Sequence, residues 1–160
     1  MHRFLPLVAS LAVGAASAAP CEAPEWRQFD FWLGEWTVFG PAGKVAGTNV
    51  ITREYGGCVV HERYTTERGY AGESLNAWDV DRKVWHQTWV DNAGTLLLLE
   101  GRLEGSAMVL QGAGVDEGRP VKHRITWTPN ADGTVRQHWE TAVPDGAWKT
   151  AFDGLYRRKP

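Results

Sequence analysis

Turn-forming residues recur along this chain at intervals that leave room only for short segments between them. Nine clusters rich in glycine, proline, aspartate and asparagine divide the sequence after residue 33 into ten such segments. The clusters lie at residues 41–43, 55–57, 69–72, 79–82, 91–94, 104–105, 117–120, 129–133 and 144–146. Side chains of these types accept positive φ angles or fix φ, as tight turns require. The spacing therefore predicts ten short extended segments joined by hairpins.

The segments between the turns have the composition and the period of β-strands. Residues 85–89 (WHQTW) and 123–127 (HRITW) alternate bulky with polar side chains, and a further strand is expected over Ser74–Trp78. After the first residues, only Pro24–Leu33 is suited to one or two helical turns. Because no βαβ alternation is present and nearly every connection has hairpin length, we predict an all-β fold, an antiparallel up-and-down β-barrel of about ten strands.

Residues 1–18 have the features of a secretory signal peptide. Arg3 supplies the positive charge, Phe4–Ala15 form an apolar stretch, and Ala16–Ala18 provide a small-residue cleavage site. We therefore expect a leader over residues 1–18 and a single barrel domain over residues 19–160, exported to the periplasm or to the medium.

Two cysteines, Cys21 and Cys58, occur in the chain. In an exported protein such a pair predicts one disulfide, which would fix the N-terminal segment to the strand that begins near Cys58. The alternative, a redox or metal-binding pair, requires a close C-x-x-C spacing or partner ligands, and the sequence has neither.

Charge and motifs limit the possible partners. The formal net charge is −2 at pH 7 and no long like-charge run is present, so we expect no nucleic-acid partner and no membrane insertion after removal of the leader. The oligomeric state is left open. Gly72–Asn76 lacks the final glycine of a nucleophile elbow, and the histidines show no metal-ligand spacing. We predict no metal site and no cofactor.

The segment Phe29–Trp36 (FDFWLGEW) sets a Gly-x-Trp motif in an aromatic cluster just before the first strand. Together with residues 85–91 (WHQTWVD), 123–129 (HRITWTP) and 152–156 (FDGLY), it resembles the DUF1579-type bacterial proteins, a lipocalin-like (calycin) family. The resemblance implies a calycin-type barrel and no established reaction. In small barrels of this type the N-terminal segment plugs one end, and a late arginine covers the plug tryptophan. A more distant resemblance is to nitrobindin-type haem barrels.

All nine tryptophans follow the leader. Rings of this size fill the interior of a small barrel or line a cavity for a flat or apolar ligand. Trp32 and Trp36 are expected in the plug and core. If the rings of the later strands point inward, the alternation places one polar side chain between bulky neighbours on each strand. The predicted ligand-binding residues are Glu62, Trp85, Gln87, Trp89, His123, Trp127, Gln137 and Trp139.

These residues predict that the barrel binds a small, apolar or aromatic molecule in its interior. An inward Glu62 would have a raised pKa unless it is paired, whereas an outward Glu62 would lie beside Arg63. Three alternatives stay open. One is an isomerase or hydrolase that uses Glu62 and His123 as an acid–base pair, a second is haem binding through His123 or His138, and a third is a structural module with a filled core.

Overall fold

A computed structural model of the protein describes residues 21–160, so the expected leader lies outside the described residues. The described chain forms ten strands, which follow a short helix, α1 (Pro24–Arg27), and a first 3-10 turn, η1 (Asp30–Trp32). The strands are β1 (Gly34–Phe39), β2 (Val45–Glu54), β3 (Val59–Thr65), β4 (Ala71–Asp79), β5 (Val84–Asp91), β6 (Leu96–Glu104), β7 (Ala107–Asp116), β8 (Arg119–Pro129), β9 (Val135–Ala142) and β10 (Lys149–Arg158). A second 3-10 turn, η2 (Tyr55–Gly57), joins β2 to β3.

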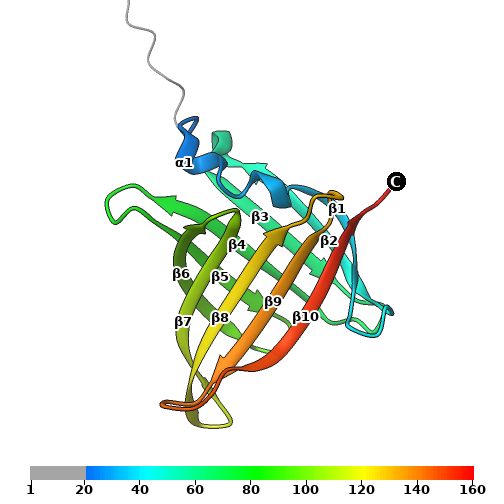
Figure 1. Ribbon diagram of the computed structural model, residues 1–160, viewed down its shortest axis with the longest axis vertical. Coiled ribbons are helices and arrows are strands. Elements are labelled where there is room, and N and C mark those ends of the chain that lie inside the picture. Colours follow the sequence, from blue (N-terminus) through cyan, green and yellow to red (C-terminus); the bar gives the residue numbers. More distant parts are fainter. Residues whose placement is uncertain (1–20) are drawn as a thin grey trace, which may run out of the picture.

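Each strand pairs antiparallel with its neighbours in sequence, and β1 pairs with β10 to close the sheet into a barrel (Figure 1). The predicted up-and-down β-barrel is therefore confirmed. Each of the nine predicted turn clusters overlaps one of the nine connections between strands. The strand expected over Ser74–Trp78 is longer than predicted, because β4 begins three residues earlier at Ala71.

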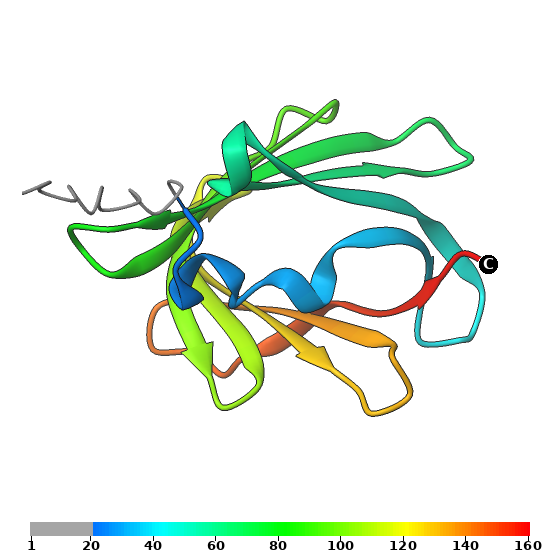
Figure 2. The same cartoon turned by 90° about the horizontal axis from the view of Figure 1, so that it is seen from above.

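The N-terminal segment lies across one end of the barrel, where α1 and η1 form a plug (Figure 2). Pro24 begins α1, a position where its missing N–H is not needed. Phe29 and Trp32 are fully buried and their rings stack at 4.8 Å between centroids. The plug thus supplies aromatic rings that fill this end of the barrel, as the resemblance implies.

The Gly-x-Trp motif fixes the plug to the barrel wall. The Trp36 indole N–H donates to the Trp32 carbonyl at 2.9 Å. The Arg158 guanidinium lies 4.4 Å from the centre of the Trp36 ring and donates to the Leu33 carbonyl at 3.0 Å. A late arginine therefore covers the plug tryptophan, as expected.

A disulfide between Cys21 and Cys58 joins the start of the plug to the β2–β3 connection, as predicted, with 5.0 Å between the two Cα atoms. Nearby, the Arg53 guanidinium contacts the Asp30 carboxylate and donates to the Gly57 carbonyl. These contacts tie the plug to β2 and β3. Within residues 21–160, no helix has the length and apolar character needed to cross a membrane.

Candidate functional site

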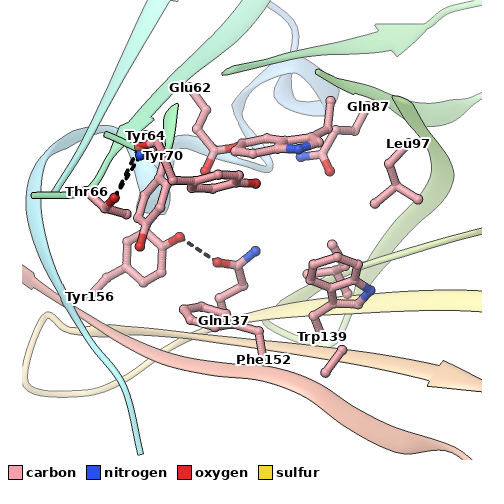
Figure 3. Close-up of a pocket in the computed structure, with 13 residues that line it drawn as sticks. Glu62, Tyr64, Thr66, Tyr70, Gln87, Leu97, Gln137, Trp139, Phe152 and Tyr156 are labelled. Carbon is pink, nitrogen blue, oxygen red and sulfur yellow. Dashed lines mark hydrogen bonds between the residues drawn. The ribbon is translucent and has the colours of Figure 1, made fainter. Parts of the chain in front are cut away.

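The barrel contains a cavity of about 260 Å³, whose lining includes no residue of α1 or η1. Figure 3 shows the side chains that line it. Its wall is made by inward side chains of β3, β5, β6, β8, β9 and β10, and by the connection between β3 and β4. The lining residues are Glu62, Tyr64, Thr66, Tyr70, Gln87, Trp89, Leu97, Ile125, Gln137, Trp139, Ala151, Phe152 and Tyr156. Alternation along the strands puts most of these side chains inside, because successive residues point to opposite faces of the sheet. Ala151 and Phe152 both line the cavity because the register of β10 with β9 shifts between Thr150 and Phe152.

Aromatic rings form most of the apolar wall, and two of them lie over glycines on the neighbouring strand. A Cβ atom at Gly72 would collide with the Trp89 ring, and one at Gly47 would collide with the Tyr64 ring. Both rings can therefore lie close to the backbone of the wall instead of filling the interior. The two glycines help to keep the cavity open.

A buried carboxyl group, Glu62, lines the cavity and is 3% exposed. Its oxygen Oε1 accepts from the Asn49 amide at 2.7 Å, and Oε2 accepts from the Ser74 hydroxyl at 2.7 Å. Among the ion pairs of residues 21–160, none involves Glu62. Neutral donors from β2 and β4 thus hold this carboxyl without a countercharge.

Burial raises the pKa of Glu62 to about 7, against the lowering effect of the hydrogen bonds from Asn49 and Ser74. Near neutral pH the group is therefore divided between its acid and its carboxylate. In one form it can donate a hydrogen bond into the cavity, and in the other it can accept one from a ligand or attract a positive charge.

Two hydrogen-bonded chains extend from this carboxyl around the barrel. On one side the Asn49 amide also donates to the Tyr156 hydroxyl at 3.3 Å, and that hydroxyl donates to Gln137. On the other side Asn76 donates to the Ser74 hydroxyl at 2.9 Å and accepts from Gln87 at 2.8 Å. Figure 3 shows Glu62 and Gln87 across the cavity from Gln137 and Tyr156.

Asp91 fixes the aromatic side chains near the open end of the barrel. Its oxygen Oδ2 accepts from the Tyr70 hydroxyl at 2.8 Å and from the Trp89 indole at 3.0 Å. Partial burial raises the pKa of Asp91, but hydrogen bonds from Thr95, Trp89 and Tyr70 outweigh this and hold it at about 2. Tyr70 and Trp89, which both line the cavity, are therefore hydrogen-bonded to a carboxylate that is ionised at neutral pH.

The structure brings five of the eight residues predicted for the site to the cavity wall. These are Glu62, Gln87, Trp89, Gln137 and Trp139. The inward orientation expected for these late strands is also present in Trp85 and Trp127, but both pack against the plug instead of the cavity. Trp85 donates to Gln28 at 3.1 Å, and the Trp127 ring lies 5.3 Å from that of Phe29.

His123 points inward but is not among the lining residues, because Trp139 lies against it. The Trp139 indole N–H donates to His123 Nδ1 at 3.2 Å, and the space over Gly114 is occupied by His123 Nε2. Glu62 bonds to Asn49 and Ser74, so the acid–base pair of Glu62 and His123, one of the three alternatives, is not formed in this structure. Arg124, which lies next to His123 on β8, pairs with Glu140 at 2.9 Å.

The histidine positions do not fit haem ligation in the cavity. His138 bonds to Thr150 at 3.0 Å, on the side of β9 opposite the inward Gln137 and Trp139. In His123, Nδ1 accepts from the Trp139 indole and Nε2 lies over Gly114. In the described part of the chain there is also no cluster of three or more histidine, cysteine, aspartate or glutamate side chains suited to a metal ion.

The sequence did not predict the residues that bond to Glu62, Asn49 and Ser74, nor Asn76, which bonds to Ser74. Asn49, Ser74 and Asn76 are each at most 1% exposed and all point inward. The alternation of β2 contains the signal for Asn49, because it lies between the inward Gly47 and Ile51. Tyr156 was also missed, although it follows the inward Phe152 and Gly154 at the same spacing.

The fold and the site together define the class as a lipocalin-like, plugged up-and-down barrel with an internal cavity. Comparison of the chain with models of known protein families and with curated proteins finds no match.

Proposed function

We propose that the protein is an exported lipocalin-like barrel, related to the DUF1579-type proteins, that binds a small and largely apolar or aromatic molecule in its cavity. The observation that supports this most directly is the composition of the cavity wall. Aromatic and aliphatic side chains surround a few polar groups, which gather around Glu62 and Gln137. This is the general plan of small-molecule sites, in which apolar surface supplies affinity and a few polar groups set orientation.

The cavity volume limits the size of the ligand. About 260 Å³ lies just below the range of roughly 300–1,000 Å³ for typical ligand pockets. A molecule with a single ring system or a short chain fits this space. Burial of its apolar surface would contribute about 2.5 kcal/mol per 100 Å² removed from water.

The family and the export are parts of the same proposal. The Gly34-x-Trp36 plug, the Arg158 side chain over Trp36 and the ten-stranded barrel agree with the resemblance. The Cys21–Cys58 disulfide is compatible with an oxidising compartment. Amino-terminal sequencing of the protein from its native source would test the expected cleavage after residue 18.

Filling the cavity tests the binding proposal. Leu97 is 4% exposed and lines the cavity, whereas its neighbour Leu98 is 47% exposed on the outside of the same strand. We expect Leu97→Trp to abolish the binding of indole, measured by calorimetry, and Leu98→Trp to leave it unchanged. Native mass spectrometry of the protein from its exported fraction should also show a co-purified small molecule that is lost on denaturation. Equal binding of indole by both variants, or none by the unmodified protein, would count against a cavity ligand.

A further inference from the structure

We propose that the cavity ligand is an organic cation, an aromatic or alkyl amine whose ammonium group binds Glu62 while its apolar part lies against the aromatic wall. This inference rests on the proposed function and specifies the chemical class of the ligand. Its basis is the arrangement of charge and of hydrogen-bonding groups around the cavity.

The first observation is the charge of the cavity wall. Among the described residues that line it, Glu62 is the only one with a carboxyl group, and none is a lysine, arginine or histidine. A buried carboxylate without a countercharge is unfavourable, since the interior solvates it less well than water does. A ligand ammonium would supply the missing charge at the place where the protein provides none.

The second observation is the supply of hydrogen-bond acceptors beside Glu62. Each oxygen of its carboxylate accepts one bond from the protein and retains a second acceptor position. The neighbouring Asn49 Oδ1 is buried and has no partner among the described residues. An ammonium group carries three donors and no acceptor, which suits this end of the cavity.

The third observation is the aromatic wall together with Asp91. Aromatic faces attract cations, and Trp89, Tyr70 and Trp139 all line the cavity. Because Trp89 and Tyr70 both donate to the Asp91 carboxylate, these two rings carry a negative group at their edges. An anionic ligand such as a fatty acid would meet Glu62 without a countercharge, beside two rings that are bonded to a second carboxylate, so the same features disfavour it.

Three small molecules of nearly equal shape separate this inference from the proposed function. They are phenethylamine, phenethyl alcohol and hydrocinnamate, which are cationic, neutral and anionic at pH 8. We expect calorimetry at pH 8 to show phenethylamine binding at least about tenfold more tightly than phenethyl alcohol, as a charge-assisted hydrogen bond allows, with hydrocinnamate the weakest.

The variant Glu62→Gln should remove the preference for the amine and leave the affinity for the alcohol within about twofold. The matched control is Glu73→Gln, which makes the same change at an exposed carboxylate on β4. Equal affinity of the unmodified protein for amine and alcohol, or a preference that survives in Glu62→Gln, would overturn the inference while leaving the proposed function intact. Failure of all three molecules to bind would contradict both.

A second measurement needs no variant at Glu62. An ammonium favours the ionised carboxylate, so binding of phenethylamine at pH 7 should release about half a proton per site, as calorimetry in buffers of different ionisation enthalpy would show. Binding of the alcohol should release none. The amine affinity should fall as the pH is lowered from 8 to 5.5.

Other titratable groups near Glu62 do not account for such a proton. Burial raises the pKa of Tyr64 and of Tyr156 above the usual value, so neither tyrosine titrates in this range. His61 lies on the outer face of β3 between Glu54 and Glu73. Proton release that disappears in a His61→Asn variant, or that is absent from the unmodified protein, would contradict the role of Glu62.

Discussion

At the scale of single residues, Glu62 is the titratable group of the cavity wall whose pKa is raised to about 7, because it is buried and only neutral side chains bond to it. Asn49 and Ser74 donate to it, but neither supplies charge. Burial thus acts on this carboxyl without the compensation that Arg63 and His61 give to Glu54 on the outer face, where hydrogen bonds lower the pKa of Glu54 to about 2. Two glutamates within nine residues of each other therefore have opposite pKa shifts.

The raised pKa of Glu62 predicts a specific dependence of stability on pH. The pKa in the folded protein, about 7, lies above the ordinary value of 4.5, so the folded state binds the proton more tightly than the unfolded chain does. The stabilisation from this group is complete below about pH 4.5 and is lost as the pH rises through 7. Relative to Glu62→Gln, urea denaturation should show the unmodified protein losing about 2 kcal/mol between pH 5 and pH 8.

The comparison with Glu62→Gln cancels the other titrating groups, which the two proteins share. Glutamine has the shape of protonated glutamate, so its carbonyl can accept from Asn49 and its amide can donate to the Ser74 oxygen. A difference in unfolding free energy that stays constant from pH 5 to pH 8 would show that Glu62 has an ordinary pKa.

At the scale of elements, the plug and the strands next to the cavity determine how much of the interior stays empty. The plug fills its end of the barrel with Phe29 and Trp32, against which Trp85 and Trp127 pack. The other half of the barrel lacks such an insertion, and its rings lie against the wall over glycines. The two ends therefore differ in packing although the strands run through both.

Removing the disulfide should destabilise the plug end. The bond joins residues 37 positions apart, and the chain-entropy model gives about 4 kcal/mol for a loop of this length. We expect the double variant Cys21→Ser, Cys58→Ser to lose about this much in urea denaturation. Reductant should destabilise the unmodified protein by a similar amount and have no effect on the double variant. An unchanged denaturation midpoint would show that the link adds no stability.

Substitution of Gly72 tests the contact between β4 and the Trp89 ring. A methyl group there would collide with the ring, so we expect Gly72→Ala to destabilise the barrel by about 1–3 kcal/mol and to weaken indole binding by displacing Trp89 into the cavity. The control is Gly40→Ala, whose nearest neighbour would be the Lys44 carbonyl oxygen at 3.9 Å. Equal stability and binding in the two variants would contradict this account of Gly72.

The elements also show which parts of the site the sequence could predict. Turn residues and alternation predicted the number of strands and which side chains point inward, since both are local properties. The depth of a side chain along the barrel axis, by contrast, is not a local property of the sequence. Trp85 and Trp89 both point inward, but they are four residues apart, which is about 13 Å along the strand, so one meets the plug and the other the cavity. The stagger of the strands sets that depth, and a single sequence does not reveal it.

The hydrogen-bond partners of Glu62 could not be predicted from the sequence for a related reason. Asn49 and Ser74 are unremarkable polar residues in strands that also carry outward polar side chains, and only the register of β2 with β3 and of β3 with β4 brings them to the carboxyl. Ile51 and Ser74 are the residues directly opposite Glu62 on these two strands. Such registers follow from the closed sheet rather than from the composition of any one strand.

At the scale of the whole molecule, closure of the barrel depends on a seam between the two ends of the sheet. Trp36–Phe39 pair with Leu155–Arg158 across this seam. The hairpin of β7 and β8, elsewhere in the sheet, is longer and pairs Met108–Asp116 with Arg119–Trp127. The short seam joins residues that are distant in sequence, whereas the long hairpin joins residues that are close.

This difference predicts where the barrel opens first. Amide hydrogens in the seam between β1 and β10 should exchange with solvent faster than those shared by β7 and β8, because a short pairing opens at lower cost than the whole barrel. Hydrogen-exchange mass spectrometry of the native protein would show this. Equal protection of the two regions would indicate that the barrel opens only by global unfolding.

The plug has a practical consequence for attaching the protein to other objects. Cys21 lies at the plugged end, and β10 runs back to that same end, so both ends of the described chain are there (Figure 1). A fluorophore, a sensor surface or a fused protein joined at either end would therefore face away from the side where the cavity lies. The barrel could be immobilised by its termini in an analytical device with its interior still accessible to molecules in solution.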